Sequence, residues 1–255
     1  MIDEPIRHSI TKMSHLHFAA TDYYAQRIIQ MGEEPWRVTM SGAPSLDNIH
    51  NSNMLKSSEL KDRYGIDLAE PTLIVTFHPV TLDYENTEGH LNELLAALEK
   101  SEYSVVFTYP NADTQGRLII KMIQQFVDEH RNALIVDNLG IEAYFGLLNN
   151  ATAMVGNSSS GIIEAASFKL PVVNIGDRQR GRIHGKNVID VGNSQSEILK
   201  GIKKATSSSF LSSLEGLVNP YGDGFSSEMI VNTLGSVQLN DQLLYKKFFD
   251  TGDRL

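Results

Sequence analysis

The stretch Ala151–Ala166, ATAMVGNSSSGIIEAA, decides the fold of this chain. It consists of a short apolar run, a turn of glycine, asparagine and three serines, and then a helical pattern. We expect a buried strand to deliver its carboxyl end to a hydroxyl-rich loop, directly before a helix begins. Backbone N–H groups, serine hydroxyls and the helix dipole favour an anion there. Because ligands of open α/β sheets bind at the carboxyl ends of strands, phosphate is the first candidate ligand.

The bulk composition excludes several classes of protein. The chain has 255 residues, 41% of them hydrophobic, which suits one large or two small α/β domains. It has no cysteine, which excludes a disulfide framework and a cysteine–zinc site and fits a reducing cytosol. The net charge of -9, without a Lys/Arg cluster, argues against a nucleic-acid partner. No apolar run approaches ~18 residues and no signal pattern opens the chain, so we expect a cytoplasmic protein without a membrane partner.

Strands and helices alternate regularly through the middle of the chain. Strands are expected at Thr72–Phe77, Tyr103–Tyr109, Ala133–Val136, Thr152–Val155 and Pro171–Ile175, with a further strand in HGKNVIDV. Helical patterns follow, such as Leu91, Leu94, Leu95 and Leu98 on one apolar face, then Ile119–Phe126, Ile141–Leu148 and Ser159–Ser167. Short connections between alternating elements predict an α/β fold with a doubly wound parallel sheet.

The two ends of the chain are less regular. The first residues give a helix, a strand, a helix and a strand at 8–14, 16–21, 22–31 and 37–40, too few to cover both faces of a parallel sheet. The polar stretch Asn48–Glu70 is the best candidate for a connection between domains. Helices are expected at Gln195–Thr206, Ser226–Leu234 and Asp241–Phe249. The last is too apolar for a free tail, which predicts that it packs on another domain or subunit.

Two polar residues, His78 and Asn111, follow the predicted strands Thr72–Phe77 and Tyr103–Tyr109. His78 ends the strand Thr72–Phe77, and Pro79 halts the strand behind it. A histidine there faces the ligand crevice, where proton transfer or a hydrogen bond to phosphate suits its pKa. The alternative is a histidine satisfied by local backbone, and position alone leaves both open. Asn111, in YPNAD, is by itself ordinary turn chemistry.

Further candidates follow the predicted strands Thr152–Val155 and Pro171–Ile175. Three consecutive serines exceed the need of a helix cap, which favours Ser158 and Ser159 as ligand-binding groups. Glu164 either complements the helix dipole or accepts hydrogen bonds from ribose. Arg178 and Arg182, in GDRQRGR, either bind phosphate or belong to a solvated loop. The carboxyl ends of four strands therefore carry residues able to meet a phosphorylated sugar.

Six segments together resemble one family: IDEPIRHSITK, VTFHPVTLDYEN, YPNAD, GNSSSGIIEA, LPVVNIGDRQRGR and YGDG. They are similar to the hydrolysing UDP-N-acetylglucosamine 2-epimerases, which make N-acetylmannosamine for sialic acid; relatives act on similar UDP-sugars for legionaminic-type acids. The resemblance runs from Ile2 to about Leu234. Non-hydrolysing epimerases typically carry HRREN where this chain has HPVTLDYEN, which favours the hydrolysing branch.

The resemblance implies two Rossmann-like domains that face each other across a cleft, the GT-B arrangement. It makes residues 1–47 a remnant of the first domain, 48–70 a linker and 71–235 a UDP-binding domain. Residues 236–255 would form a helix that packs on the first domain or a partner. The family's first domain supplies about 140 residues before Asp3, the size of an α/β domain, including another catalytic carboxylate. We therefore expect a truncated chain, or one completed by a separate polypeptide.

The resemblance also implies a reaction and its residues. UDP is eliminated from UDP-N-acetylglucosamine and water then adds, with Asp3 acting on the sugar and His78 assisting departure of the phosphate. The residues implied in UDP binding are His78, Asn111, Leu139 with its backbone on uracil, Ser158 and Ser159 on the phosphates, Glu164 on the ribose, and Arg178. No metal or cofactor is implied. The implied partners are a UDP-sugar and either further copies of the chain or a complementing N-terminal domain. A UDP-sugar glycosyltransferase and a non-catalytic nucleotide-binding module are the rival hypotheses.

Overall fold

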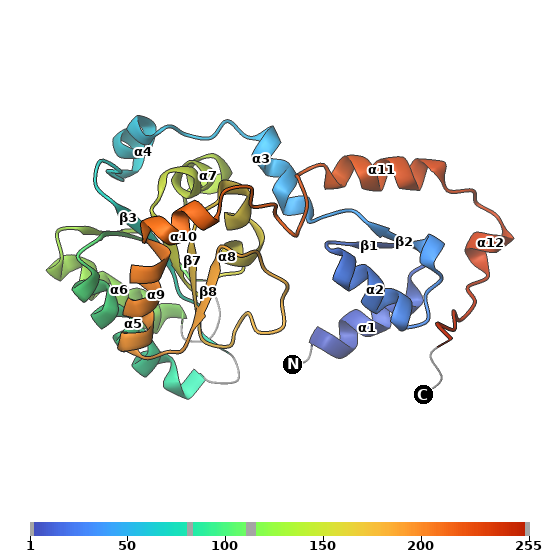
Figure 1. Ribbon diagram of the computed structural model, residues 1–255, viewed down its shortest axis with the longest axis horizontal. Helices are drawn as coiled ribbons and strands as arrows, with labels where there is room; N and C mark the ends of the chain where they lie inside the picture. The colour runs from blue at the N-terminus through green and yellow to red at the C-terminus, as the bar shows by residue number, and fades with distance from the viewer. Residues whose placement is uncertain (1–2, 81–83, 111–115, 253–255) are drawn as a thin grey trace. The chain divides into compact units, whose positions relative to one another are not determined.

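The computed structural model describes residues 3–80, 84–110 and 116–252 (Figure 1). The chain divides into two compact units. Unit 1 combines residues 1–51 with residues 220–255, and unit 2 comprises residues 52–219. Within the described ranges, no helix is long and apolar enough to cross a membrane.

Unit 2 is built on a six-stranded, entirely parallel sheet with the order β5-β4-β3-β6-β7-β8. Its strands are β3 (Thr72–Thr76), β4 (Ser104–Thr108), β5 (Ala133–Val136), β6 (Ala153–Gly156), β7 (Val172–Ile175) and β8 (Val188–Val191). The strand order reverses between β3 and β6, which pair in register from Leu73 opposite Ala153 to Thr76 opposite Gly156. In doubly wound sheets such a reversal opens a ligand crevice at the carboxyl ends of the two strands.

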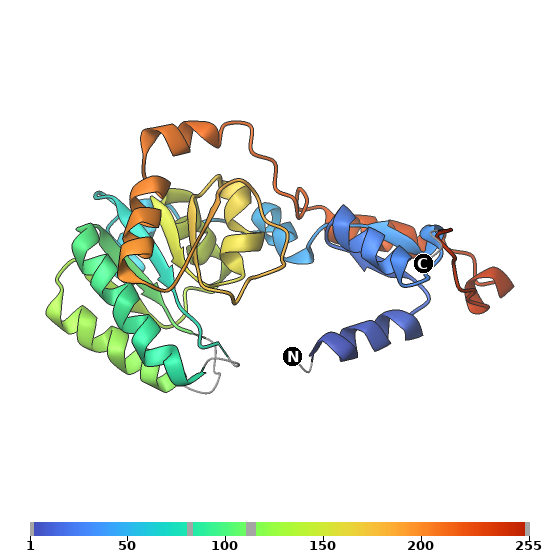
Figure 2. The same cartoon turned by 60° about the horizontal axis from the view of Figure 1, so that its bottom comes forward.

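Helices cover both faces of this sheet (Figures 1 and 2). On one face lie α5 (Thr87–Ser101), α6 (Gly116–Glu129) and α9 (Gln195–Ala205); on the other lie α7 (Gly140–Asn150), α8 (Ser160–Ile163) and the 3-10 turn η4 (Ala165–Phe168). Alternate strand residues such as Leu73, Val75 and Val155 join the core under α5 and α9. The predicted doubly wound α/β fold is confirmed.

The polar stretch predicted as a linker is largely ordered. The stretch includes most of α3 (Asp47–Asn51) and all of α4 (Ser57–Tyr64). Leu60 on α4 is buried, as is the nearby Ile66. The backbone N–H of Leu55 donates to the carbonyl of Glu142 on α7. Most of this stretch therefore packs in unit 2, and its polar composition reflects a short helix with one buried side.

The C-terminal helices also differ from the expectation. Residues 226–236 form α11, which belongs to unit 1 and not to unit 2, the unit with the six-stranded sheet. The helix expected over Asp241–Phe249 ends at Leu244, where α12 (Asp241–Leu244) stops. The short helix α10 (Ser208–Ser213) has no counterpart in the sequence prediction.

Unit 1 contains a small parallel sheet flanked by helices. Strand β1 (His17–Ala19) pairs with β2 (Val38–Met40), and helices α1 (Asp3–Met13) and α2 (Asp22–Gln30) adjoin them in the chain. The N-terminal helix thus begins earlier than the sequence pattern indicates.

Within unit 1, buried charges attach the C-terminal segment to the N-terminal elements. The Glu33 carboxylate accepts hydrogen bonds from Lys12 at 2.6 Å, Lys246 at 2.7 Å and His17 at 3.0 Å. Burial alone raises the pKa of Glu33, but these three donors outweigh it and lower the pKa to about 2. The ion cluster therefore joins α1, β1 and the C-terminal segment through one carboxylate.

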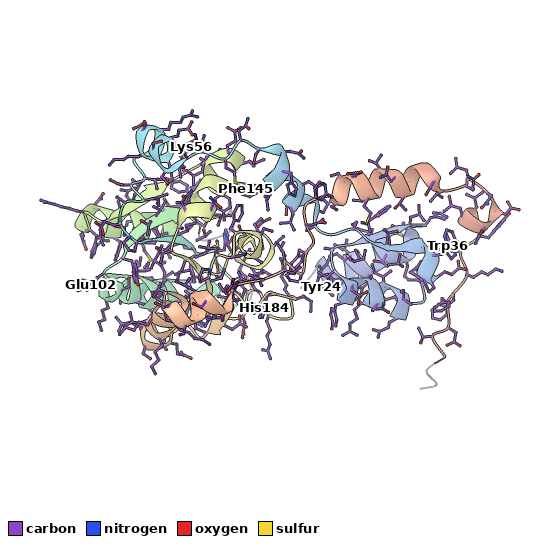
Figure 3. All side chains as sticks on the ribbon, turned by 45° about the horizontal axis from the view of Figure 1, so that its top comes forward. Tyr24, Trp36, Lys56, Glu102, Phe145 and His184 are labelled. Carbon is purple, nitrogen blue, oxygen red and sulfur yellow. The ribbon has the colours of Figure 1, made fainter. Side chains whose placement is uncertain are left out.

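A buried arginine adds a second attachment within unit 1. The Arg37 guanidinium donates to the carbonyl oxygens of Gln242 at 2.6 Å and Leu243 at 3.0 Å, and it lies over the ring of Trp36, which Figure 3 labels. Carbonyls at a helix end are acceptors without intrahelical partners. Arg37 therefore holds the end of α12 in place.

The YGDG motif, read from the sequence as a tight turn before a helix, packs beside an earlier loop of unit 1. Ala43 donates its backbone N–H to the Tyr221 carbonyl at 2.8 Å. Asp47 then caps α11 by accepting from the backbone N–H groups of Ser226 at 2.9 Å and Ser227 at 2.6 Å. Asp47 thus fixes the start of α11, just after the motif.

Candidate functional site

Asn157, the first residue after β6, ties the two strands at the reversal of strand order together. Its side chain is 1% exposed. Its Oδ1 accepts from the backbone N–H of His78 at 2.7 Å, and its Nδ2 donates to the His78 carbonyl at 2.9 Å. Its own N–H donates to the Thr76 carbonyl at 3.1 Å. This one side chain therefore fixes the main chain on both sides of the crevice.

The preceding glycine permits the close approach of β3 and β6. Gly156 has a φ of 133°, and a Cβ built on it would lie 2.0 Å from the carbonyl oxygen of Thr76. No side chain fits there, and the backbone conformation is one that L-residues rarely adopt. The first glycine of GNSSSG is thus a packing requirement of the crevice.

The loop after β7 reaches the same point. Arg178 Nη1 donates to the main-chain carbonyl of Asn157 at 3.0 Å, and Gln179 Nε2 donates to the same oxygen at 2.8 Å. Arg182 is exposed, as is Arg180, whose guanidinium lies 3.8 Å from Asp177. The structure therefore brings Arg178 to Asn157 and leaves Arg182 at the surface of the loop.

The serine loop departs from the expected geometry in one respect. The predicted helix Ser159–Ser167 is divided into α8, which ends at Ile163, and the turn η4, closed by Lys169 at a φ of 52°. The chain must return to β7 at Val172 within a few residues, so a long helix has no room. The helix dipole expected at this loop is correspondingly small, and hydroxyls and the guanidinium are the groups left for an anion.

The hydroxyls of this loop are partly buried. Ser158 Oγ accepts from the backbone N–H of Ser160 at 3.3 Å, and the side chain of Ser159 makes no capping bond to α8. Glu164 ends α8 and is partly buried. Ser158 and Ser159 thus follow Asn157 directly, and Glu164 lies at the far end of the short helix α8.

A pocket of about 280 Å³ lies at the carboxyl ends of β4 and β5. It is lined by Thr108, Tyr109, Val136, Asp137, Asn138, Leu139, Gly140, Ile141, Tyr144 and Phe145, the last of which Figure 3 labels. Leu139 is buried, and its carbonyl accepts from the Tyr64 hydroxyl at 3.2 Å. Apolar walls with backbone polar groups at the start of a helix suit a flat heterocyclic base.

One hydrogen bond connects this pocket to the serine loop. The Tyr144 hydroxyl donates to Ser160 Oγ at 2.6 Å. Burial raises the pKa of Tyr144 to about 12, so its hydroxyl stays protonated at neutral pH.

The structure thus gathers most of the predicted residues in unit 2. Asn157 links His78 and Arg178, the serines and Glu164 follow Asn157, and Leu139 lines the neighbouring pocket. Asn111 lies outside the described residues, and Asp3 starts α1 in unit 1 with its side chain likewise outside them. Over the described part of the chain, no group of three or more metal-ligating side chains gathers.

Sequence reasoning missed Asn157 and Tyr144. Asn157 was visible only as part of a turn, although its place directly after a buried strand is the same signal that selected His78. Tyr144 stands in an apolar helical pattern, where an aromatic residue is read as core.

Several known proteins that are similar to this chain are named 2-epimerases. The family described as UDP-N-acetylglucosamine 2-epimerase matches residues 1–235. The GDP/UDP-N,N'-diacetylbacillosamine 2-epimerase (hydrolyzing) of Campylobacter jejuni is 39% identical over 98% of this chain and 65% of its own length. The UDP-N,N'-diacetylbacillosamine 2-epimerase (hydrolyzing) of Legionella pneumophila is 37% identical over 96% of this chain and 64% of its own. The chain thus spans just under two thirds of the length of these relatives.

A solved structure agrees with the fold. The complex of S. aureus MnaA with UDP has a TM-score of 0.70 and 18% sequence identity, covering 88% of this chain and 60% of that one. At this identity the likeness shows the fold alone.

Proposed function

We propose a function for this chain from one premise: it belongs to the UDP-N-acetylglucosamine 2-epimerase family. In this proposal unit 2 binds UDP, and the chain carries the UDP-binding part of a hydrolysing 2-epimerase. The complete reaction turns UDP-N-acetylglucosamine and water into N-acetylmannosamine and UDP. Residues 1–47 then belong to the first domain of the family, and the protein acts in the cytoplasm.

The observation that carries this proposal is the convergence on Asn157. His78 and Arg178 come from different strand ends, and both are held by hydrogen bonds to that residue. Donors fixed before the ligand arrives stabilise charge that develops on a leaving diphosphate, because they need no reorganisation during the reaction. A guanidinium and serine hydroxyls are suitable donors to phosphate oxygens.

The other residues take roles that follow from this placement. Leu139 presents its backbone to uracil in the 280 Å³ pocket, and Glu164 accepts hydrogen bonds from the ribose hydroxyls. Asn111 adds a contact to UDP, and Ser158 and Ser159 donate to its phosphates. Asp3 acts on the sugar, where removal of the C2 proton needs a base. His78 assists departure of the phosphate.

Calorimetry with UDP and product analysis with UDP-sugars test this proposal. We expect the isolated chain to bind UDP and to show weak or absent turnover of UDP-N-acetylglucosamine and UDP-N,N'-diacetylbacillosamine. Release of UDP that depends on an added sugar acceptor would indicate a glycosyltransferase instead. Full turnover by the chain alone would defeat the expectation of weak turnover, and absence of UDP binding would refute the proposal.

Alanine variants locate the diphosphate. Replacing Ser159 or Arg178 by alanine removes charge-assisted hydrogen bonds and is expected to weaken UDP binding by about 1–3 kcal/mol. Arg180→Ala is the matched control, because Arg180 lies in the same loop with its side chain 81% exposed. Unchanged affinity in both site variants would remove Ser159 and Arg178 from the site.

A further inference from the structure

Tyr144 touches both parts of the candidate site. It lies on α7, and its side chain lines the pocket at the ends of β4 and β5. Its hydroxyl extends to the serine loop, where it donates to Ser160 Oγ at 2.6 Å. A single rigid side chain therefore spans the distance from the base pocket to the phosphate loop.

The direction of this hydrogen bond fixes what Ser160 can do. A serine hydroxyl has one proton to donate. Since the Ser160 oxygen accepts from Tyr144, its proton must point elsewhere, and the side chain is partly exposed at the start of α8. Chains of hydroxyls polarise one another, which makes the second hydroxyl a stronger donor.

The surroundings keep Tyr144 in the donor role. Burial raises its pKa to about 12, and the charge of Glu164 contributes to the same upward shift. Glu164 ends the short helix that Ser160 begins, so Tyr144, Ser160 and Glu164 share one corner of unit 2. That corner lies between the pocket proposed for uracil and the loop proposed for the phosphates.

We propose that Tyr144 is a positioning residue that orients the Ser160 hydroxyl as a donor to a phosphate of a bound uridine diphosphate. This inference rests on the proposed function and extends it. It assigns the third serine of the loop to the phosphate and makes the aromatic wall of the base pocket its support. Binding of the base in the pocket and binding of the phosphates by the serine loop are thereby coupled.

Four variants and two ligands test this assignment. Tyr144→Phe, Ser160→Ala and the double variant are titrated calorimetrically with UDP and with uridine, which lacks the phosphates. We expect each single variant to weaken UDP about three- to tenfold and uridine by less than about twofold, and the double variant to bind UDP no more weakly than the weaker single. Tyr103→Phe is the control, because Tyr103 stands just before β4, at the opposite edge of the sheet, packed on the core.

Each other outcome overturns the inference. UDP affinity that Tyr144→Phe leaves unchanged removes the positioning role, and equal losses for uridine and UDP show that the phenol only shapes the pocket. Losses that multiply in the double variant show that the two hydroxyls act independently. If Tyr144→Phe fails to fold, the ratio of UDP to uridine affinity in Ser160→Ala decides alone. A wild-type chain that binds neither ligand refutes the proposed function itself, whereas wild-type binding with normal variants refutes only the role of Tyr144.

Discussion

Replacement of Asn157 by alanine tests the crevice most directly. The variant loses both hydrogen bonds that connect the side chain to the main chain of His78, at 2.7 and 2.9 Å. A typical hydrogen bond contributes about 1 kcal/mol net, and each buried backbone group left unpaired costs about 1–3 kcal/mol. Because Asn157 and His78 are both buried, we expect the free energy of unfolding of unit 2 to fall by about 2–5 kcal/mol.

Asn187→Ala is the matched control. Asn187 is 0% exposed and stands just before β8, at the amino edge of the sheet. Its side chain donates one hydrogen bond, to the Leu170 carbonyl at 2.9 Å, and its Oδ1 has no partner within the described residues. One hydrogen bond and one stranded carbonyl give an expected loss of about 1–2 kcal/mol, with UDP affinity unchanged.

Urea denaturation followed by far-UV circular dichroism measures both variants. The chain contains a single tryptophan, Trp36 in unit 1, so its fluorescence reports separately on the unit that neither substitution touches. We expect Asn157→Ala to weaken UDP binding by about tenfold as well, because the main chain of His78 loses both hydrogen bonds that hold it, whereas the main-chain carbonyl that accepts from Arg178 remains. The reasoning is refuted if Asn157→Ala destabilises the protein no more than Asn187→Ala does.

Two further substitutions are predicted from the contacts. Gly156→Ala places a Cβ 2.0 Å from the Thr76 carbonyl oxygen at a φ of 133°, so this variant should lower the free energy of unfolding of unit 2, measured in urea, by about 3 kcal/mol or more. The control Gly89→Ala, in α5 with open space around it, should raise the free energy of unfolding by about 0.5–1 kcal/mol, and equal effects of the two variants would contradict this explanation. Because the folded-state pKa of Glu33 is lowered to about 2, Glu33 contributes up to about 3 kcal/mol to the free energy of unfolding above pH 4.5, its ordinary pKa, and this contribution is lost as the pH falls toward 2. Glu33→Gln should therefore flatten the dependence of the stability of unit 1 on pH in this range, measured by Trp36 fluorescence. An unchanged pH dependence would show that the ion cluster does not stabilise unit 1.

The sheet could be predicted from the sequence because its central strands, β3, β6 and β7, are buried on both faces. Continuous apolar runs such as Thr72–Thr76 stand out between polar turns, and their observed ends lie within about one residue of the expected ones. The segment before β3 gave no comparable signal. Its buried apolar residues are Leu55, Leu60 and Ile66, so the exposed polar residues dominated the pattern and a linker was predicted.

The candidate site was predictable to the extent that it depends on strand ends. His78, Ser158 and Arg178 were selected because each follows a strand, and parallel strands present their carboxyl ends at one edge. The hydrogen bonds that hold them depend on side-chain geometry that no local pattern encodes. The acceptor of Arg178, for example, is a main-chain carbonyl 21 positions away.

Asn157 explains why stability and binding are joined at this edge. Its side-chain amide pairs with the main-chain N–H and carbonyl of His78, just after β3, and its main-chain carbonyl accepts from Arg178 and Gln179. Every partner is therefore fixed before a ligand arrives, which lowers the ordering cost of binding. Ser159, by contrast, makes no capping bond to the helix it precedes. Removing the Asn157 side chain should thus cost folding and affinity together, whereas removing the Ser159 hydroxyl should cost affinity alone.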